Sequence, residues 1–547
     1  MTEEQIKNTG NAPEESEVSE AEELSAEDLN ELRLIRREKL AKLREAGRDP
    51  YLNESWDVTD SAAGVCARFE AAEEMAPQNA LDVTSLRSAA ALDVTSLRSA
   101  AADGAKELPE IRVSLAGRIM ANRHMGKASF IDVHDKSGKI QVYVRRDVIG
   151  DEEYEWFLTD DIGDIVGVSG TVFRTRHGEI TVRAERLVLL SKSLQILPNK
   201  WQGLRDNDLR YRQRYVDLIM NPDVRETFLK RAKILREIRR YLEEDEGFLD
   251  VDTPILTVIA GGANARPFAT HHNTLDIDMK LRISNELYLK RLVVGGFDRV
   301  YEMGKMFRNE GMDRNHNPEF TAMELYQAYG QMEDVMRLTE QIVYHAALAA
   351  GGSPVIEYQG KTFDLTPPWD RLSMQDAIRA KLGEDFDRIE TDEEARAAAK
   401  KHHIENADKL TRGKIIAELF EAYCEDDLDG PVFITGHPVE ISPLAKRDAS
   451  DPRITRRFEA YINTWEVANG FSELNDPIDQ LARFQAQQAQ LEAGDSEAHP
   501  MDEDFVNALK VGMPPTGGLG VGIDRVIMLL TNAPSIRDII LFPTMKP

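Results

Sequence analysis

Apolar and polar residues alternate through Arg299-Val-Tyr-Glu-Met-Gly-Lys-Met-Phe-Arg-Asn-Glu-Gly311 and again through Asn317-Pro-Glu-Phe-Thr-Ala-Met-Glu-Leu-Tyr326. This period of two is typical of β-strands, and the polar loop between the halves predicts a long antiparallel hairpin. The first arm would carry Arg308 and Glu310 to the loop, and the second would return with Glu324 and Tyr326 on one face. A solvated hairpin with ordinary surface charges is the alternative interpretation.

A second hairpin is predicted where Glu459 and Glu466 stand seven residues apart. This odd spacing would put the two carboxylates on opposite faces of one strand, but a turn at Asn463-Thr464 would return both to one face of a strand pair. Two carboxylates on one face can bind one metal ion. Period two beyond Glu466 predicts a shared face for Asn469, Phe471 and Glu473.

Glycines dominate the C-terminal segment 514–530, which is typical of a strand running into a helix that begins near Arg525. Gly518, Gly520 and Gly522 do not match the GxGxxG spacing of dinucleotide-binding proteins, and no acidic residue follows at the required distance. Glycines in a central strand instead let a flat ligand such as an adenine lie against the backbone.

The candidate catalytic groups are two arginines, Arg308 and Arg525, and two carboxylates, Glu459 and Glu466. The sequence has no recognisable serine or cysteine nucleophile paired with a histidine, no HExxH and no GxxxxGK. Arginine forks match phosphate geometry, and Mg²⁺ prefers carboxylate and phosphate oxygens. The set therefore predicts phosphoryl or nucleotidyl transfer from ATP, assisted by Mg²⁺.

Residues 111–195 contain several short strands separated by Gly, Asp and Lys turns. This pattern predicts a small closed or partly closed barrel, for which we prefer an OB-fold. Such barrels bind unstacked bases by aromatic stacking and by hydrogen bonds to base edges. The candidate residues are Phe130, Gln141 and Glu185, with Arg123 and Lys127 near phosphate. Phe130 is equally compatible with a place in the barrel core.

The composition limits the partners and the compartment. A chain of 547 residues exceeds one hydrophobic core and predicts two or three domains. Its formal charge of −28 argues against non-specific binding to DNA or to acidic membranes, so any RNA contact needs local basic patches. The sequence has no apparent signal peptide, no apolar run of about 18 residues and no cysteine cluster. We therefore expect a cytoplasmic protein without membrane association.

The chain divides into five predicted segments with one insertion. They are a disordered acidic tail at 1–30, a helical extension at 31–110, the barrel at 111–195, a linker at 196–225, and a catalytic domain at 226–547 that contains a helical insertion at about 371–429. The extension includes a basic amphipathic helix from Leu32 to Ala46, which suits an acidic protein, RNA backbone or simple solvation equally. It also includes the 11-residue sequence ALDVTSLRSAA, present at 80–90 and again at 91–101, to which we assign no function.

A helix over 227–246, a short strand over 248–251 and Pro254 follow the linker. This unit could form the contact of a homodimer, which we expect, but an ordinary helix packed on a sheet is an equally serious interpretation.

Six segments, in this order and spacing, closely resemble bacterial-type class II lysyl-tRNA synthetases: RYRQRYVDL, NELYLKRL, FRNEG, HNPEFTAMELY, NGFSELND and GLGVGIDR. The resemblance covers about residues 111–547. It implies an α+β protein with an N-terminal OB-fold β-barrel that binds the anticodon, and a class II catalytic antiparallel sheet flanked by helices. The implied reaction is ATP-dependent ligation of L-lysine to tRNA(Lys) through a lysyl-adenylate, with release of AMP and pyrophosphate.

The resemblance also implies roles for individual residues. Arg308 would hold the α-phosphate of ATP and Arg525 the γ-phosphate, with Glu310 in the same catalytic set. The other ATP contacts would be His316, Asn317, Phe320 and Glu466, and the Mg²⁺ ligands Glu459 and Glu466. Lysine would be bound by Gly261, Glu286, Glu324, Tyr326, Asn469, Phe471 and Glu473. The anticodon would be bound by Arg123, Phe130, Gln141 and Glu185.

Three alternatives remain at this point. A paralogue that lysylates a translation factor is expected to lack the barrel. An aspartyl or asparaginyl enzyme would need a basic substrate pocket, which Glu286, Glu324 and Glu473 do not provide. A non-catalytic RNA-binding homologue would not require the arginines and carboxylates of the predicted ATP site.

Overall fold

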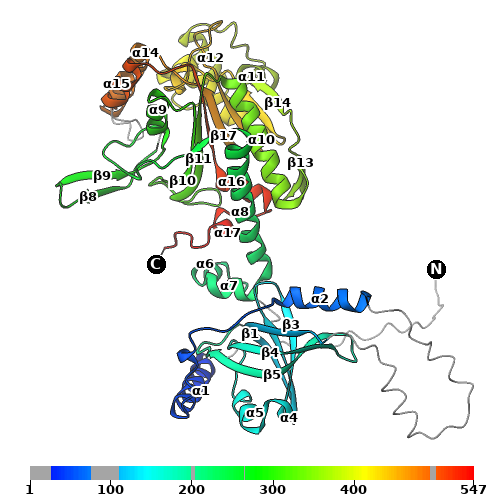
Figure 1. Ribbon diagram of the computed structural model, residues 1–547. Helices are drawn as coiled ribbons and strands as arrows, with labels where there is room; N and C mark the ends of the chain where they lie inside the picture. The colour runs from blue at the N-terminus through cyan, green and yellow to red at the C-terminus, as the bar shows by residue number, and fades with distance from the viewer. Residues whose placement is uncertain (1–25, 76–109, 199–203, 264, 493–500, 547) are drawn as a thin grey trace, which may run out of the picture. The chain divides into compact units, whose positions relative to one another are not determined.

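The computed structural model describes residues 26–75, 110–198, 204–263, 265–492 and 501–546. They form two compact units, Met1–Gln202 and Gly203–Pro547 (Figure 1). The predicted tail up to residue 25 and the tandem repeat at 80–101 lie outside the described residues. Within the described part of the chain, no helix is long and apolar enough to cross a membrane.

The first unit contains the predicted barrel. Its five strands close in the order β1-β2-β3-β5-β4, with bounds β1 (Arg112–Met125), β2 (Ala128–His134), β3 (Lys139–Arg145), β4 (Ile165–Arg174) and β5 (Ile180–Ser191). Val142 and Val144 point into the barrel and are fully buried, whereas Tyr143 between them is partly exposed. Alternation along the strands therefore builds the core, and two short helices, α4 (Arg146–Ile149) and α5 (Asp151–Phe157), join β3 to β4.

Helix α1 (Ala26–Glu45) is longer than predicted, because residues 26–30, expected in the acidic tail, are helical. Two of its basic side chains point into its own unit. Arg36 donates hydrogen bonds to the carbonyls of Ser193 and Gln195, and Lys39 pairs with Asp161 at 2.6 Å. The extension continues through η1 (Pro50–Leu52) and α2 (Ala62–Met75).

Lys192 is a buried cation at the end of β5. Its ammonium lies 2.6 Å from carboxylate oxygens of both Asp161 and Asp164, and its side chain is fully buried. Since Lys39 also reaches Asp161, this cluster connects α1 to the barrel through paired charges.

The second unit is built on an eight-stranded sheet in the order β14-β15-β16-β17-β18-β11-β10-β6. The strands are β6 (Leu249–Asp250), β10 (Arg299–Phe307), β11 (Glu319–Ala328), β14 (Asp370–Ser373), β15 (Val432–Thr435), β16 (Arg457–Ile462), β17 (Trp465–Ser472) and β18 (Thr516–Val521). The inner pairs are antiparallel, as predicted, but both outermost pairs are parallel. Smaller sheets are formed by β7 (Leu256–Thr257), β8 (Ala269–His272) and β9 (Ile277–Leu281), and by β12 (Val355–Tyr358) and β13 (Lys361–Asp364).

The predicted hairpin is confirmed as β10 and β11, whose register pairs Glu302 with Glu324 and Met306 with Phe320. One face of the sheet carries the main core, in which Leu325 and Leu519 pack with α10 (Met332–Gly351) and α16 (Ile523–Leu530) (Figure 1). The alternate residues of these strands face the other side. The period of two thus separates a structural face from a face that is available to a ligand.

Helices complete this unit. They are α6 (Asn207–Arg212), α7 (Arg214–Met220), α8 (Pro222–Arg240), α9 (Glu286–Val294), α14 (Pro477–Glu492), α15 (Glu503–Val511) and α17 (Ile536–Ile539), with a π-helical turn η3 (Tyr241–Asp245) after α8. The predicted insertion holds α11 (Met374–Leu382), α12 (Asp392–Lys401) and α13 (Arg412–Tyr423), with single turns η4 (Ala407–Lys409), η5 (Glu425–Asp427) and η6 (Val439–Ile441) in and after it.

The structure adds detail to two of the predicted segments. Residues 370–373, at the start of the insertion predicted for about 371–429, form β14 and pair with β15, and the first helix of the insertion begins at residue 374. The predicted linker is largely helical, since it contains α6, α7 and the start of α8. The fully buried Arg214 explains this order: its guanidinium donates to the carbonyls of Leu541, Arg537 and Ile540, which ties α7 to the C-terminal segment.

Replacing Lys192 by Met should destabilise the barrel unit by about 3–5 kcal/mol, because two largely buried carboxylates would lose their shared cation. Chemical denaturation of the full chain, followed by tryptophan fluorescence, measures the change. Arg145→Gln is the control, since Arg145 makes an exposed pair with Asp147 and its loss should leave stability almost unchanged. Equal stability of the two variants would contradict a structural role for the buried cluster.

Candidate active site

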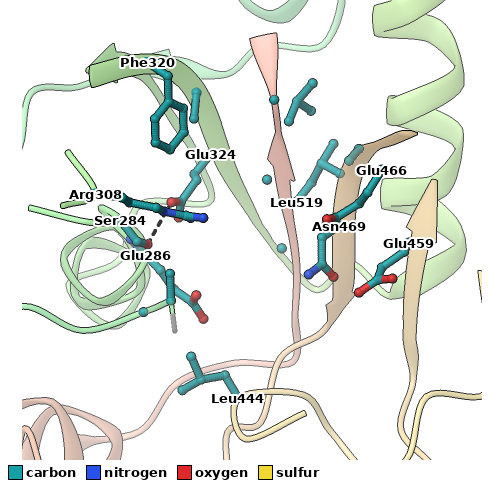
Figure 2. Close-up of a pocket in the computed structure, with 18 of the residues that line it drawn as sticks. Ser284, Glu286, Arg308, Phe320, Glu324, Leu444, Glu459, Glu466, Asn469 and Leu519 are labelled. Carbon is teal, nitrogen blue, oxygen red and sulfur yellow. Dashed lines mark hydrogen bonds between the residues drawn. The ribbon is translucent and has the colours of Figure 1, made fainter. Parts of the chain in front are cut away.

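A cavity of about 570 Å³ opens on the ligand-facing side of the eight-stranded sheet (Figure 2). The predicted substrate and metal residues that line it are Gly261, Glu286, Arg308, Glu310, His316, Asn317, Phe320, Glu324, Tyr326, Glu459, Glu466, Asn469, Phe471 and Arg525. Residues from distant parts of the chain meet here because β11, β18 and β17 are neighbours: Glu324 and Asn469 both pair with Gly520. Among the described residues that were predicted to bind ATP, lysine or Mg²⁺, Glu473 alone does not line the cavity.

Arg308 follows the last residue of β10, where its backbone N–H donates to the carbonyl of Pro318 at 2.9 Å. Its guanidinium lies 5.2 Å from the centre of the Phe320 ring, so the two side chains stack (Figure 2). Burial lowers the pKa of Arg308 from its usual value, but an arginine stays protonated. Its buried Nε has no hydrogen-bond partner among the described residues. Arg308 is therefore a cation fixed in place by Phe320, and its Nε–H is free to donate a hydrogen bond to a bound anion.

Arg525 lies in the first turn of α16 and faces His316 of the hairpin loop. Arg525 Nη2 is 3.0 Å from His316 Nε2, and an arginine can only donate, so Nε2 accepts. His316 Nδ1 then carries the hydrogen and donates to Asp313, 2.8 Å away. Partial burial favours a higher pKa for Asp313, but the hydrogen bond from His316 helps to hold this pKa below its usual value. The sequence did not indicate Asp313, which orients the histidine ring.

Asp524 and Arg231 are two further residues that sequence reasoning missed. The buried carboxylate of Asp524 pairs with Arg231 at 2.7 Å and accepts from the backbone N–H of Thr321 at 2.7 Å. These contacts bind the start of α16 to α8 and β11. Asp524 thereby fixes the position from which the neighbouring Arg525 extends.

Glu459 and Glu466 lie on one face of β16 and β17, as predicted (Figure 2). They are not direct partners, because Glu459 pairs with Asn469 and Glu466 pairs with Tyr461. The turn is made by Asn463 and Thr464, which both have positive φ, at 53° and 63°. In a regular strand Glu466 and Asn469, three positions apart, would face opposite sides, but a β-bulge at Val467 places them on the same side.

The environments of the two carboxylates differ. Glu459 accepts hydrogen bonds from Arg457 and Tyr461. Burial favours a higher pKa for Glu459, but His437, Arg457 and these hydrogen bonds together lower its pKa below the usual value. Burial, with the adjacent negative charge of Glu459, raises the pKa of Glu466 to about 7. Among the described residues no cluster of three or more His, Cys, Asp or Glu could hold a metal alone. The donor set suits a hard divalent cation that takes its other ligands from a bound phosphate.

The other end of the cavity is acidic. Glu324 accepts a hydrogen bond from Ser284 Oγ at 2.8 Å and one from the Tyr326 hydroxyl at 3.1 Å (Figure 2). Burial and, to a smaller extent, the nearby negative charge of Glu286 together raise the pKa of Glu324 to about 7. Asn469 is held by Arg457, whose Nε donates to its side-chain oxygen at 3.2 Å. A cationic ligand placed here would relieve the repulsion between Glu286 and Glu324.

Glu473 lies behind the cavity wall, fully buried, and pairs with Lys290 of α9. Lys290 also donates to Glu286. Gly518 is required beside them: a Cβ there would lie 1.8 Å from Glu473 Oε1 and 2.6 Å from Tyr326 Cε1. Lys290 was not predicted as a site residue, although its spacing of four from Glu286 on a helix was a usable signal.

On the barrel, Arg123 and Phe130 pair across β1 and β2, and Phe130 stacks on Tyr143 with ring centres 4.6 Å apart. Both rings are partly exposed, which settles the open question against a core position for Phe130. Gln141 is buried and donates to Glu179 at 3.0 Å. Glu185 pairs with Arg112 at 2.9 Å instead of joining this group, so Glu179 is the acidic residue beside Gln141.

Comparisons with known proteins agree with this architecture. The family model described as tRNA synthetases class II (D, K and N) matches residues 206–546, and the OB-fold nucleic acid binding domain model matches residues 113–190. Lysine--tRNA ligase of Thermoanaerobacter pseudethanolicus is 53% identical over 96% of this chain and 97% of its own length.

Two further relatives have the same name. They are lysine--tRNA ligases of Moorella thermoacetica, 52% identical over 95% of this chain and 98% of its own length, and of Bacillus cereus, 51% identical over 96% and 99%. Because these matches cover 95–96% of this chain, they include both units. The chain is therefore a member of the lysine--tRNA ligase family of class II tRNA synthetases.

Proposed function

We propose that the cavity carries out the reaction of this family in two steps. L-lysine first reacts with ATP to give lysyl-adenylate and pyrophosphate, and the lysyl group then passes to the 3′ end of tRNA(Lys), releasing AMP. The observation that carries the proposal is the meeting of two arginines, two paired carboxylates and an acidic pocket in one cavity. The barrel, absent from the expected translation-factor paralogue, favours tRNA as the acceptor.

ATP is proposed to bind at the hairpin end of the cavity. Arg308 would hold the α-phosphate, since its guanidinium has a buried unused donor beside Phe320. Arg525 would hold the γ-phosphate, while its contact with Glu466 keeps it at the cavity rim. The adenine and ribose contacts are proposed for Glu310, His316, Asn317 and Phe320, with adenine lying against the glycines of β18.

Mg²⁺ fits the carboxylates of Glu459 and Glu466, which lie on the same face of the β16–β17 hairpin. Bound there with the nucleotide, it would neutralise phosphate charge during pyrophosphate release. Glu466, whose pKa is raised to about 7 by desolvation and by the nearby charge of Glu459, gains most from a cation. The protein's own contribution is to hold both ligands on one strand pair before ATP arrives.

Lysine is proposed to occupy the acidic end, between Glu286, Glu324, Tyr326, Asn469 and Phe471, with Gly261 near its amino group. A neutral or acidic competitor would leave these buried carboxylates without a cation, which costs several kcal/mol. The lysine carboxylate is already ionised at neutral pH, so it can attack the α-phosphorus without a general base. The hydroxyl at the 3′ end of the tRNA would then attack the adenylate carbonyl, which transfers the lysyl group to the tRNA and releases AMP.

The outer face of the barrel is the proposed anticodon site. Phe130 and Tyr143 offer ring faces for stacking, and Gln141 offers an amide. Arg123 is proposed to contact phosphate or base edges nearby. We retain Glu185 as a proposed contact and add Glu179, because its carboxylate lies beside Gln141.

A homodimer is proposed from apolar side chains exposed around β6, β7 and the β8–β9 hairpin, which projects from the sheet (Figure 1). They are Leu249, Ile255, Leu256, Val258, Ile259 and Leu275. Several exposed apolar side chains on neighbouring segments are typical of subunit interfaces. A single monomeric species at micromolar concentration in analytical ultracentrifugation would contradict this proposal.

The proposed compartment is the cytoplasm, where ATP and tRNA occur together. Cys66 and Cys424 are unpaired thiols, which suits a reducing environment.

Amino-acid-dependent exchange of pyrophosphate into ATP, measured with each of the twenty amino acids, tests the proposed function. Lysine should support exchange and aspartate and asparagine should not, because the substrate pocket is acidic. Charging of tRNA(Lys) should follow under the same conditions. Exchange with aspartate but not with lysine would overturn the assignment.

Glu324→Gln should lower kcat/KM for lysine about 10–150-fold, the factor that corresponds to a charge-assisted hydrogen bond of about 1.5–3 kcal/mol. In the wild type at saturating ATP and Mg²⁺, kcat/KM for lysine should fall as the pH drops through about 7, because Glu324 becomes protonated. The variant should lack this step. Glu357→Gln, an exposed change on β12, is the control and should keep the wild-type profile.

Phe130→Leu should lower kcat/KM for tRNA(Lys) charging about 5–150-fold, as expected for loss of about 1–3 kcal/mol of base stacking. ATP–pyrophosphate exchange should be unchanged, because it does not use the barrel. A matched loss in both assays would indicate a folding defect and would refute a separate anticodon role.

A further inference from the structure

Lys290 is a buried cation in the wall of the lysine pocket. It lies one helical turn after Glu286 on α9, pairs with Glu286 and Glu473, and is fully buried. Its ammonium also lies over three rings, at 5.4 Å from Phe471, 5.8 Å from Tyr326 and 5.9 Å from Phe505. Such rings favour a cation at this position.

Arg291, the next residue on α9, does not pair with these carboxylates. Arg291 pairs with Asp502 at 2.8 Å and Asp504 at 3.0 Å, at the start of α15. The charged groups that face the Lys290 ammonium are therefore Glu286 from its own helix and Glu473 from the segment after β17, with Glu324 and the Tyr326 hydroxyl from β11 close behind. Lys290 is thus one ammonium paired with two carboxylates, and the charge of Glu324 acts on one of them, Glu473.

The electrostatic effect of Lys290 follows from this arrangement. Burial opposes its charge, but Glu286 and Glu473 together raise its pKa, so the ammonium persists. Burial raises the pKa of Glu473 to about 8, and Lys290 opposes that rise. Removal of the ammonium would leave Glu286, Glu324 and Glu473 to repel one another, and protons would replace it.

We propose that Lys290 is a positioning residue for the activation of lysine. It acts through Glu286, turning that carboxylate so that one oxygen holds Lys290 while the group still lines the cavity. The incoming lysine then meets a carboxylate whose direction is already fixed. The inference rests on the proposed function, because it concerns how the pocket binds lysine.

Lys290→Met tests the inference in ATP–pyrophosphate exchange with the full-length protein. KM for lysine should rise about tenfold at pH 7, which corresponds to about 1.4 kcal/mol of binding lost when Glu286 is no longer held in place. KM for ATP should stay within about twofold, because Lys290 pairs with Glu286 and Glu473 and not with the arginines of the proposed ATP site. Because Lys290 opposes the rise in the pKa of Glu473, KM for lysine should depend on pH differently in the variant and in the wild type between about pH 6.5 and pH 8.5.

Three further variants separate positioning from folding. Lys192→Met removes a similarly buried lysine between two carboxylates in the barrel unit, so it should reduce stability but leave KM for lysine unchanged. Lys290→Arg keeps the charge and should restore KM for lysine to within about threefold of the wild type. Lys290→Gln combined with Glu473→Gln removes both charges of the Lys290–Glu473 pair, so neither partner is left as an unpaired buried charge. The KM for lysine of this double variant should still be higher than the KM for lysine of the Glu473→Gln variant.

The outcomes distinguish the two proposals. If the wild type supports exchange with lysine but the Lys290 variants keep its KM and pH profile, the positioning role is wrong and the proposed function stands. If lysine does not support exchange in the wild type, the proposed function itself fails. If the double variant folds and matches Glu473→Gln alone, Lys290 is only structural.

Discussion

The gathering of like-charged carboxylates around one cavity is the constraint on which the second unit depends. Glu286 and Glu324 lie at one end of the cavity, with Glu473 behind its wall, and Glu459 and Glu466 lie at the other end. Desolvation and neighbouring carboxylates raise the pKa values of Glu324, Glu466 and Glu473, so nearby cations are needed to keep these groups charged. The fold supplies part of the compensation through Lys290 and Arg457. The remaining negative charge suits an ammonium at one end and a metal–nucleotide complex at the other, so the same electrostatic cost selects both substrates.

Strand register converts this constraint into a working geometry. The glycines of β18 sit between β11 and β17, and their lack of side chains leaves room for Tyr326 and Glu473 beside Gly518. The bulge at Val467 keeps Glu466 on the face of Asn469 and Phe471, so the proposed metal ligands and the proposed substrate ligands share one cavity. Outside the sheet, Asp524 and Asp313 hold Arg525 and His316 in place. Positioning therefore comes from backbone pairing and buried hydrogen bonds.

Local patterns predicted most of this unit. The period of two at Arg299–Phe307 identified the hairpin, and the barrel followed from short strands and turns. Local pattern did not show contacts between distant segments: residues 370–373 pair with β15 at the edge of the sheet, and Arg214 in the helical linker donates to a C-terminal carbonyl. Glu473 shares the period of its neighbours but is buried behind them, since Lys290 draws its carboxylate away from the cavity.

The amino-acid sequence by itself determined the family, the candidate site residues and the strands that carry many of them, because these follow from residue type and from spacing along one element. Only the tertiary structure decided which groups act together. The Lys290–Glu473 pair, the Glu179–Gln141 contact and the support of Arg525 by Arg231 through Asp524 join residues far apart in the chain or on different strands. Spacing along one strand or helix carries no information about such contacts, since they depend on how separate elements pack.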